Sequence, residues 1–131
     1  MTRSIKQKIF LIYTTYDKMV NKETLDKMCK ELEEYGDVFV DLLHNNALNK
    51  QEYVLQKLLE ATSIVLVNSP EIMGSRWAQL EIKLAKEQNK QLLGYFEPSY
   101  FENTCEFKLI TNSNMAYNVM AGLNKGRNTF M

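Results

Sequence analysis

One stretch of the sequence gathers residue types that could carry acid–base or electrostatic chemistry. The pair Ser69-Pro70 is followed by Ser75, Arg76, Trp77 and Glu81. Ser75 is at a position where it could cap the start of a helix. Trp77 and Glu81 are four residues apart, so they share one face of that helix. A carboxylate beside an indole is partly desolvated, which raises its proton affinity or directs it at a developing cation. The alternative is that Trp77 packs in the core while Glu81 is solvated near the lysines of the helix.

The sequence lacks the residues that several well-known types of catalytic or binding site require. A phospho-acceptor receiver domain needs an acidic pair after its first strand and an Asp after its third, where this chain has Thr14-Thr15-Tyr16 and Asn68. The first loop contains no glycine, which excludes a phosphate-cradling loop and a dinucleotide fingerprint. No Gly-x-Ser-x-Gly elbow exists for Ser-His-Asp catalysis. His44 has no second His or Cys near it, so we expect a solvated loop residue and no metal site.

The elements that must position these residues follow a βα pattern. Apolar runs separated by amphipathic stretches predict a parallel sheet covered on both faces, with right-handed crossovers. We expect strands over residues 8–14, 37–43, 63–68, 91–96 and 107–111, and helices over 21–35, 48–61, 75–89 and 115–123. Gly36 is expected as a left-handed cap of the first helix. The expected fold is α/β, a flavodoxin-like three-layer sandwich with a central five-stranded parallel sheet of order 2-1-3-4-5.

The topology also predicts where a ligand binds. In such sheets ligands lie beyond the carboxyl ends of the strands, near the reversal of strand order. Three loops meet there, at residues 14–17, 41–48 and 68–77.

Composition narrows the class of protein. The 131 residues predict a single domain over 1–131. Sixteen basic and sixteen acidic residues give zero net charge, which argues against nucleic-acid binding and a polybasic membrane surface. No apolar run approaches the roughly 18 residues of a membrane span. Cys29 and Cys105 do not make a disulfide framework. We therefore expect a cytoplasmic protein.

Three sequence boxes resemble the Toll/interleukin-1 receptor (TIR) domain family. Residues 10–17, FLIYTTYD, are similar to the family's first-strand box, and Asp41 matches the acidic residue that often opens its BB loop. Ser69-Pro70, Ser75-Arg76-Trp77 and Glu81 resemble its serine-proline, serine-x-tryptophan, glutamate signature. Order and spacing agree over about residues 8–96. The departures are Ile12, where the family usually has serine, and residues 42–48, which lack the usual proline-glycine.

This resemblance implies an activity and a set of site residues. Many bacterial and plant TIR domains cleave NAD+ at the nicotinamide–ribose bond, and some stand-alone bacterial ones make a cyclic ADP-ribose type signal in anti-phage defence. The resemblance implies NAD+ as substrate, no cofactor, and homo-oligomers through TIR–TIR contacts. The family's catalytic glutamate falls on Glu81. The implied nucleotide-binding residues are Tyr13, Thr14, Thr15, Asp41, Ser75, Arg76 and Trp77.

Two alternative functions remain open from the sequence. One alternative is a nucleoside 2-deoxyribosyltransferase-like enzyme, a family that has a related sheet and a glutamate on the corresponding helix. This chain resembles that family in Glu81 and in Ala85, which follows it. That family typically has acidic residues just before the helix, where this chain has only Glu71. The other alternative is a non-catalytic TIR-type adaptor, which is distinguished by whether Glu81 lines an open cleft.

Overall fold

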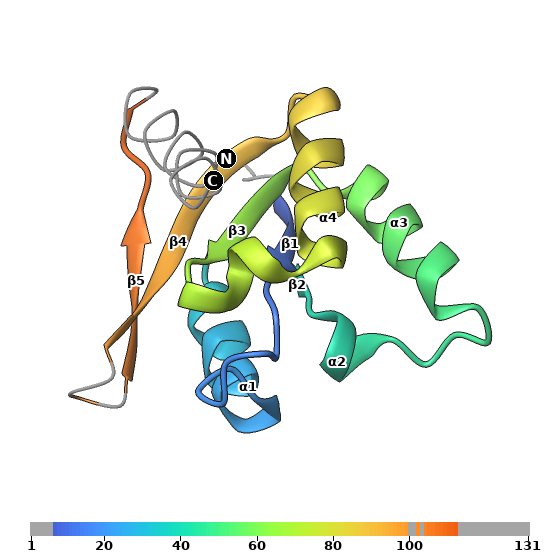
Figure 1. Ribbon diagram of the computed structural model, residues 1–131. Helices are drawn as coiled ribbons and strands as arrows, with labels where there is room; N and C mark the ends of the chain where they lie inside the picture. The colour runs from blue at the N-terminus through green and yellow to red at the C-terminus, as the bar shows by residue number, and fades with distance from the viewer. Residues whose placement is uncertain (1–6, 100–101, 103, 113–131) are drawn as a thin grey trace, which may run out of the picture.

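The computed structural model describes residues 7–99, 102 and 104–112, which form an α/β fold (Figure 1). Strands and helices alternate along most of the chain. The strands are β1 (Gln7–Ile12), β2 (Gly36–Phe39), β3 (Ser63–Val67), β4 (Gln91–Ser99) and β5 (Thr104–Leu109). The helices are α1 (Lys22–Leu32), α2 (Asp41–His44), α3 (Lys50–Glu60), the 3₁₀ helix η1 (Pro70–Gly74) and α4 (Arg76–Glu87).

The sheet has the order β2-β1-β3-β4-β5, which confirms the expected strand order. Strands β1 to β4 are parallel, as expected, but β5 is antiparallel to β4. The prediction of a wholly parallel sheet is therefore wrong at its last strand. Only residues 100–103 join β4 to β5, and a parallel crossover needs roughly a dozen residues or more. The chain therefore turns back as a hairpin.

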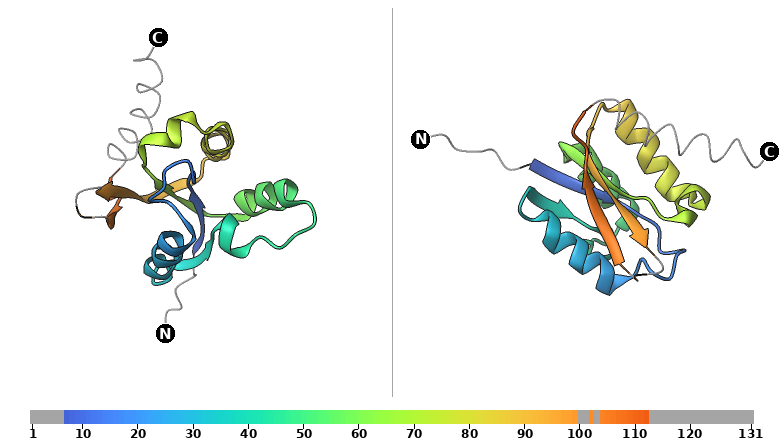
Figure 2. Two further views of the ribbon diagram at one scale, coloured as in Figure 1. Left: turned by 60° about the horizontal axis from the view of Figure 1, so that its bottom comes forward. Right: turned by 90° about the vertical axis from the view of Figure 1, so that its left-hand side faces the viewer.

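Helices cover both faces of the sheet, so the three-layer arrangement is confirmed (Figure 2). On one face, α1 packs through its buried residues, which recur at helical spacing: Leu25, Met28, Cys29 and Leu32. On the other face, α3 and α4 pack against the side chains of β1 and β3. The buried residues of α4 are Ala78, Glu81, Ile82 and Ala85, whereas Leu80 is exposed. None of the helices in the described residues has the length and apolar content needed to cross a membrane.

Several local expectations are corrected. Gly36 opens β2 instead of capping α1, and its φ is not positive. A Cβ on Gly36 would lie 2.2 Å from the carbonyl oxygen of Gln7, so a close approach between β1 and β2 requires the glycine. Strand β2 ends at Phe39, and the following residues form α2 in place of more strand. The helix expected over 115–123 lies outside the described residues.

Candidate functional site

A cleft of about 290 Å³ opens at the carboxyl ends of the strands. The loop after β1, the start of α2 and the first turns of α4 form its walls, and Figure 1 shows these segments at one edge of the sheet. The cleft thus lies where the three predicted loops meet. Its lining residues are Tyr13, Thr14, Thr15, Tyr16, Asp41, Leu42, Ser75, Trp77 and Glu81. Every predicted site residue lines it except Arg76, which is exposed at the start of α4.

Glu81 is the most deeply buried ionisable side chain of this cleft, with 4% of its surface exposed. Desolvation by burial, together with the smaller effect of the negative charge of Asp41, raises the pKa of Glu81 to about 8. A hydrogen bond from the Trp77 side chain acts in the opposite direction and lowers it. The alternative of a solvated Glu81 is therefore wrong, because the carboxyl group lies between the core and the cleft.

The start of α4 orients Trp77 and Glu81. The Ser75 side chain accepts a hydrogen bond from the backbone N–H of Ala78 at 3.1 Å, which confirms Ser75 as the helix cap. One helical turn then separates Trp77 from Glu81 on the cleft side, as their spacing predicted. Because the indole N–H is only a donor, its hydrogen bond favours the ionised form of the carboxyl group.

The loop after β1 is tied to the elements on both sides of it. The Tyr13 hydroxyl oxygen accepts a hydrogen bond from the Leu42 backbone N–H at 2.8 Å, which joins this loop to α2. Burial raises the pKa of Tyr13 to about 12, so the phenol is neutral under ordinary conditions. Asp17 accepts a hydrogen bond from the Glu71 backbone N–H at 3.0 Å, which joins the same loop to η1. The cleft therefore has fixed walls rather than free loop tips.

The charges of the lining residues are unbalanced. Asp41 and Glu81 carry carboxyl groups, Tyr13 and Tyr16 carry phenols, and no lysine, arginine or histidine is among the described residues that line the cleft. Such a lining favours a ligand that is cationic or becomes cationic during a reaction. No group of three or more His, Cys, Asp or Glu side chains within the described ranges is arranged to hold a metal ion.

Sequence reasoning missed some residues that shape the cleft. Tyr16 and Leu42 line it and are 65% and 50% exposed, so they present apolar surface at its mouth. Both lie next to predicted site residues, and that adjacency was the available signal. Asn45 does not line the cleft but donates a hydrogen bond from Nδ2 to Asp41 Oδ1 at 2.7 Å. Its position four residues after Asp41 is the spacing at which helical side chains meet, which could have indicated the pair.

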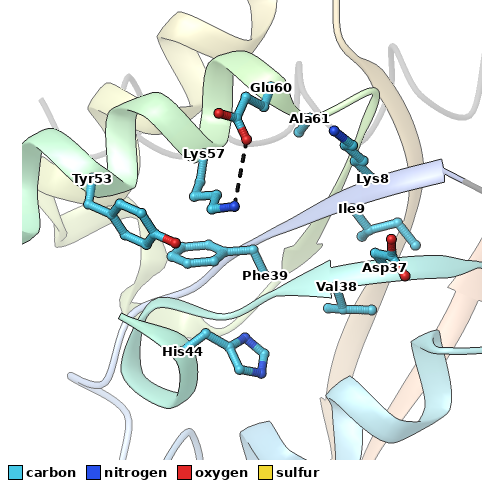
Figure 3. Close-up of a pocket in the computed structure, with 10 residues that line it drawn as sticks. All are labelled: Lys8, Ile9, Asp37, Val38, Phe39, His44, Tyr53, Lys57, Glu60 and Ala61. Atoms are coloured by element: carbon cyan, nitrogen blue, oxygen red, sulfur yellow. Dashed lines mark ion pairs between the residues drawn. The ribbon is translucent and has the colours of Figure 1, made fainter. Parts of the chain in front are cut away.

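A second cavity of about 290 Å³ lies between β2 and α3, and sequence reasoning did not anticipate it (Figure 3). Figure 3 shows the Lys57 side chain between Tyr53 and Glu60, and Lys57 forms an ion pair with Glu60 at 3.6 Å. His44 also lines this cavity, where its Nδ1 accepts a hydrogen bond from the Val40 backbone N–H at 2.9 Å. The residues that line this cavity carry charges of both signs, so the lining favours neither a cationic nor an anionic ligand, unlike that of the cleft.

No protein-family model matches the sequence, and comparison with curated proteins gives no match. The assignment of a function therefore depends on the cleft and on its residues.

Proposed function

We propose that this protein cleaves the N-glycosidic bond between nicotinamide and ribose in NAD+. The observation that carries the proposal is the buried Glu81 carboxyl group, which faces a cleft whose described lining contains no cationic side chain. The resemblance of three sequence boxes to TIR domains supports the same assignment. Such a cleft suits a reaction in which positive charge moves from a ring nitrogen to a sugar carbon.

Glu81 acts on the anomeric carbon in this mechanism. The bond between C1′ and the pyridinium nitrogen breaks, and its electron pair leaves with nicotinamide, which becomes neutral. The ribose C1′ then has oxocarbenium character, which an ionised carboxylate stabilises at close range. Water adds to C1′ and loses a proton to give ADP-ribose. A nucleophilic nitrogen of the adenine in the same molecule would give a cyclic product instead.

Substrate binding and the ionisation of Glu81 are coupled. With a pKa of about 8, Glu81 in the empty cleft is mostly protonated at neutral pH. The positive charge of a bound pyridinium ring favours the carboxylate form and lowers this pKa. The cleft thus avoids a buried negative charge until a cationic ligand is present to compensate it.

The remaining contacts extend beyond the cleft. A volume of about 290 Å³ is near the lower end for ligand pockets, so it suits the nicotinamide riboside half of the dinucleotide. The rest of NAD+ then lies at the mouth, and exposed Arg76 is the cation nearest in sequence to the cleft residues for its phosphates. Exposed Tyr16 and Leu42 are apolar groups that a second copy of the chain could cover. We propose that self-association completes the site.

The direct test is release of nicotinamide from NAD+, measured by chromatography at low and high protein concentration. We expect release that Glu81→Gln abolishes, while Glu87→Gln, an exposed carboxylate on the same helix, retains it. Release of free base from a deoxynucleoside without cleavage of NAD+ would favour the deoxyribosyltransferase alternative. Absence of any turnover under conditions where the protein forms oligomers would refute the enzymatic proposal and favour the adaptor.

A further inference from the structure

The segment that connects β2 to α3 is organised around one amide side chain. Asn45 is 5% exposed, and it is the only residue between Asp41 and Lys50 that is buried. Its Nδ2 donates to Asp41 Oδ1 at 2.7 Å and to the Lys50 carbonyl oxygen at 3.0 Å. Its Oδ1 accepts from the Ala47 backbone N–H at 3.1 Å. Both hydrogens of the amide are therefore used, and its shortest hydrogen bond is the one to Asp41.

Asp41 connects this network to the cleft. It lies in the first turn of α2 and lines the cleft, and its negative charge acts on Glu81 and on Tyr13. Its Oδ1 is engaged by Asn45, and α2 is a short helix that ends at His44. Without the hydrogen bond from Asn45, the Asp41 side chain could turn from the cleft toward water, where its charge would be screened.

We propose that Asn45 is a positioning residue, which holds the Asp41 carboxylate at the cleft wall so that a cationic substrate meets two acidic groups instead of one. The inference rests on the proposed function for its substrate, but its geometry does not depend on it. Asn45 does not touch the cleft, so it acts only through Asp41. An apolar side chain at this position would make none of the three hydrogen bonds of the Asn45 amide.

The expected size of the effect follows from the charges that surround Glu81. The ionisable side chains that line the cleft with it are Asp41 on α2 and Tyr13 and Tyr16 in the loop after β1, and Trp77 on α4 donates a hydrogen bond to it. Asp41 is therefore the one other carboxyl group in the described lining. Asp41 is the second cause, after burial, of the raised pKa of Glu81, and a neighbouring charge typically moves a pKa by roughly one unit or more. The same charge attracts a cation at that place with similar strength, which corresponds to about a tenfold change in affinity.

The test uses an optical signal inside the cleft that needs no turnover. Trp77 is the single tryptophan of the chain and hydrogen-bonds to Glu81, so its fluorescence should follow the ionisation of that carboxyl group. We expect Asp41→Asn and Asn45→Ala each to lower the titration midpoint by about one pH unit. The double variant should shift no further than Asp41→Asn alone, because Asn45 acts through Asp41. Glu81→Gln should abolish the transition, which assigns it to Glu81.

An exchanged pair separates positioning from a merely structural role. Asp41→Asn combined with Asn45→Asp restores a hydrogen bond between the two positions but moves the charge away from the cleft wall. We expect thermal stability to recover relative to Asn45→Asp alone. The titration midpoint should remain shifted, and the KM for NAD+ should remain about tenfold higher than in the unmodified protein. An unchanged midpoint in folded Asn45→Ala, or shifts that add in the double variant, would overturn the inference. A protein that shows these titration shifts but no cleavage of NAD+ would refute the proposed function and leave Asn45 as a positioning residue.

Discussion

Glu81→Gln should stabilise the folded protein at neutral pH while it abolishes the proposed reaction. Burial raises the pKa of Glu81 from an ordinary value of 4.5 to about 8, so the folded state holds a proton that the unfolded chain releases. Below pH 4.5 both states are protonated and the carboxyl group costs nothing extra. Between pH 4.5 and 8 the folded state loses about 1.4 kcal/mol of stability per pH unit relative to a neutral side chain.

The resulting magnitude is large enough to measure. The cost of Glu81 is about 3 kcal/mol at pH 7 and levels off at about 5 kcal/mol above pH 8. A glutamine of the same shape avoids this cost and can still accept the hydrogen bond of the Trp77 indole. We therefore expect Glu81→Gln to raise the free energy of unfolding by about 3 kcal/mol at pH 7, and Tm by about 10 °C.

Urea denaturation of both proteins at pH 5, 6, 7 and 8 measures this difference. The gain from Glu81→Gln should grow steadily across the series, whereas Glu87→Gln on the exposed side of α4 should show no such growth. A gain that does not change with pH, or a Glu81→Gln variant less stable than the parent at pH 7, would refute the reasoning that burial has raised this pKa.

Three further outcomes follow from the same geometry. Because the proposed reaction requires ionised Glu81 and the pKa of this group is about 8, kcat/KM for NAD+ should rise about tenfold between pH 7 and pH 9; a flat or falling profile would contradict this. Trp77→Phe removes the hydrogen bond that lowers this pKa, so the profile should move to higher pH, as stopped assays across a pH series would show. Gly36→Ala would place a Cβ 2.2 Å from Gln7 O and should cost about 2 kcal/mol or more in urea denaturation, whereas Gly74→Ala, with open space around it, should cost little.

The parallel part of the fold was predictable because its signals are local and strong. The buried residues of α1 recur at helical spacing, and β3, with every residue buried, reads as one continuous apolar run. Strand order then followed from the rules for crossover connections. The position of the cleft could be predicted for the same reason, since the carboxyl ends of parallel strands share one edge.

The edge of the sheet was less predictable because a proline can either end a strand or lie within an edge strand at a position that needs no N–H donor. The strand was expected over residues 91–96, yet β4 continues through Pro98 to Ser99. Along an antiparallel ladder, residue pairs with hydrogen bonds alternate with pairs that have none. The Ile110 N–H donates to Leu93 O, so the pair of Leu93 and Ile110 is hydrogen-bonded. Counting along the register from that pair, Pro98 and Cys105 form a pair without hydrogen bonds between β4 and β5. Strand β3 has already ended its pairing with β4 at Phe96, so the missing N–H of Pro98 removes no ladder bond.

The degree of burial of Glu81 could not be read from the sequence. Spacing placed it on the same face as Trp77 but did not show how closely α2 and the loop after β1 approach that face. The approach depends on contacts between distant residues, such as the hydrogen bond from Leu42 to Tyr13. The short helix α2 and the role of Asn45 were missed for the same reason.

The hairpin of β4 and β5 has a consequence for the order in which the chain assembles. Each neighbouring pair among β1 to β4 joins segments separated by a helix, so loop closure must precede any gain from pairing. Strands β4 and β5 are separated only by residues 100–103, so their contacts have low sequence separation and can form on the microsecond timescale typical of hairpins. The β4–β5 pair therefore needs the shortest loop closure of any neighbouring pair in the sheet, whereas β1, which lies between β2 and β3, pairs with strands at a greater sequence separation.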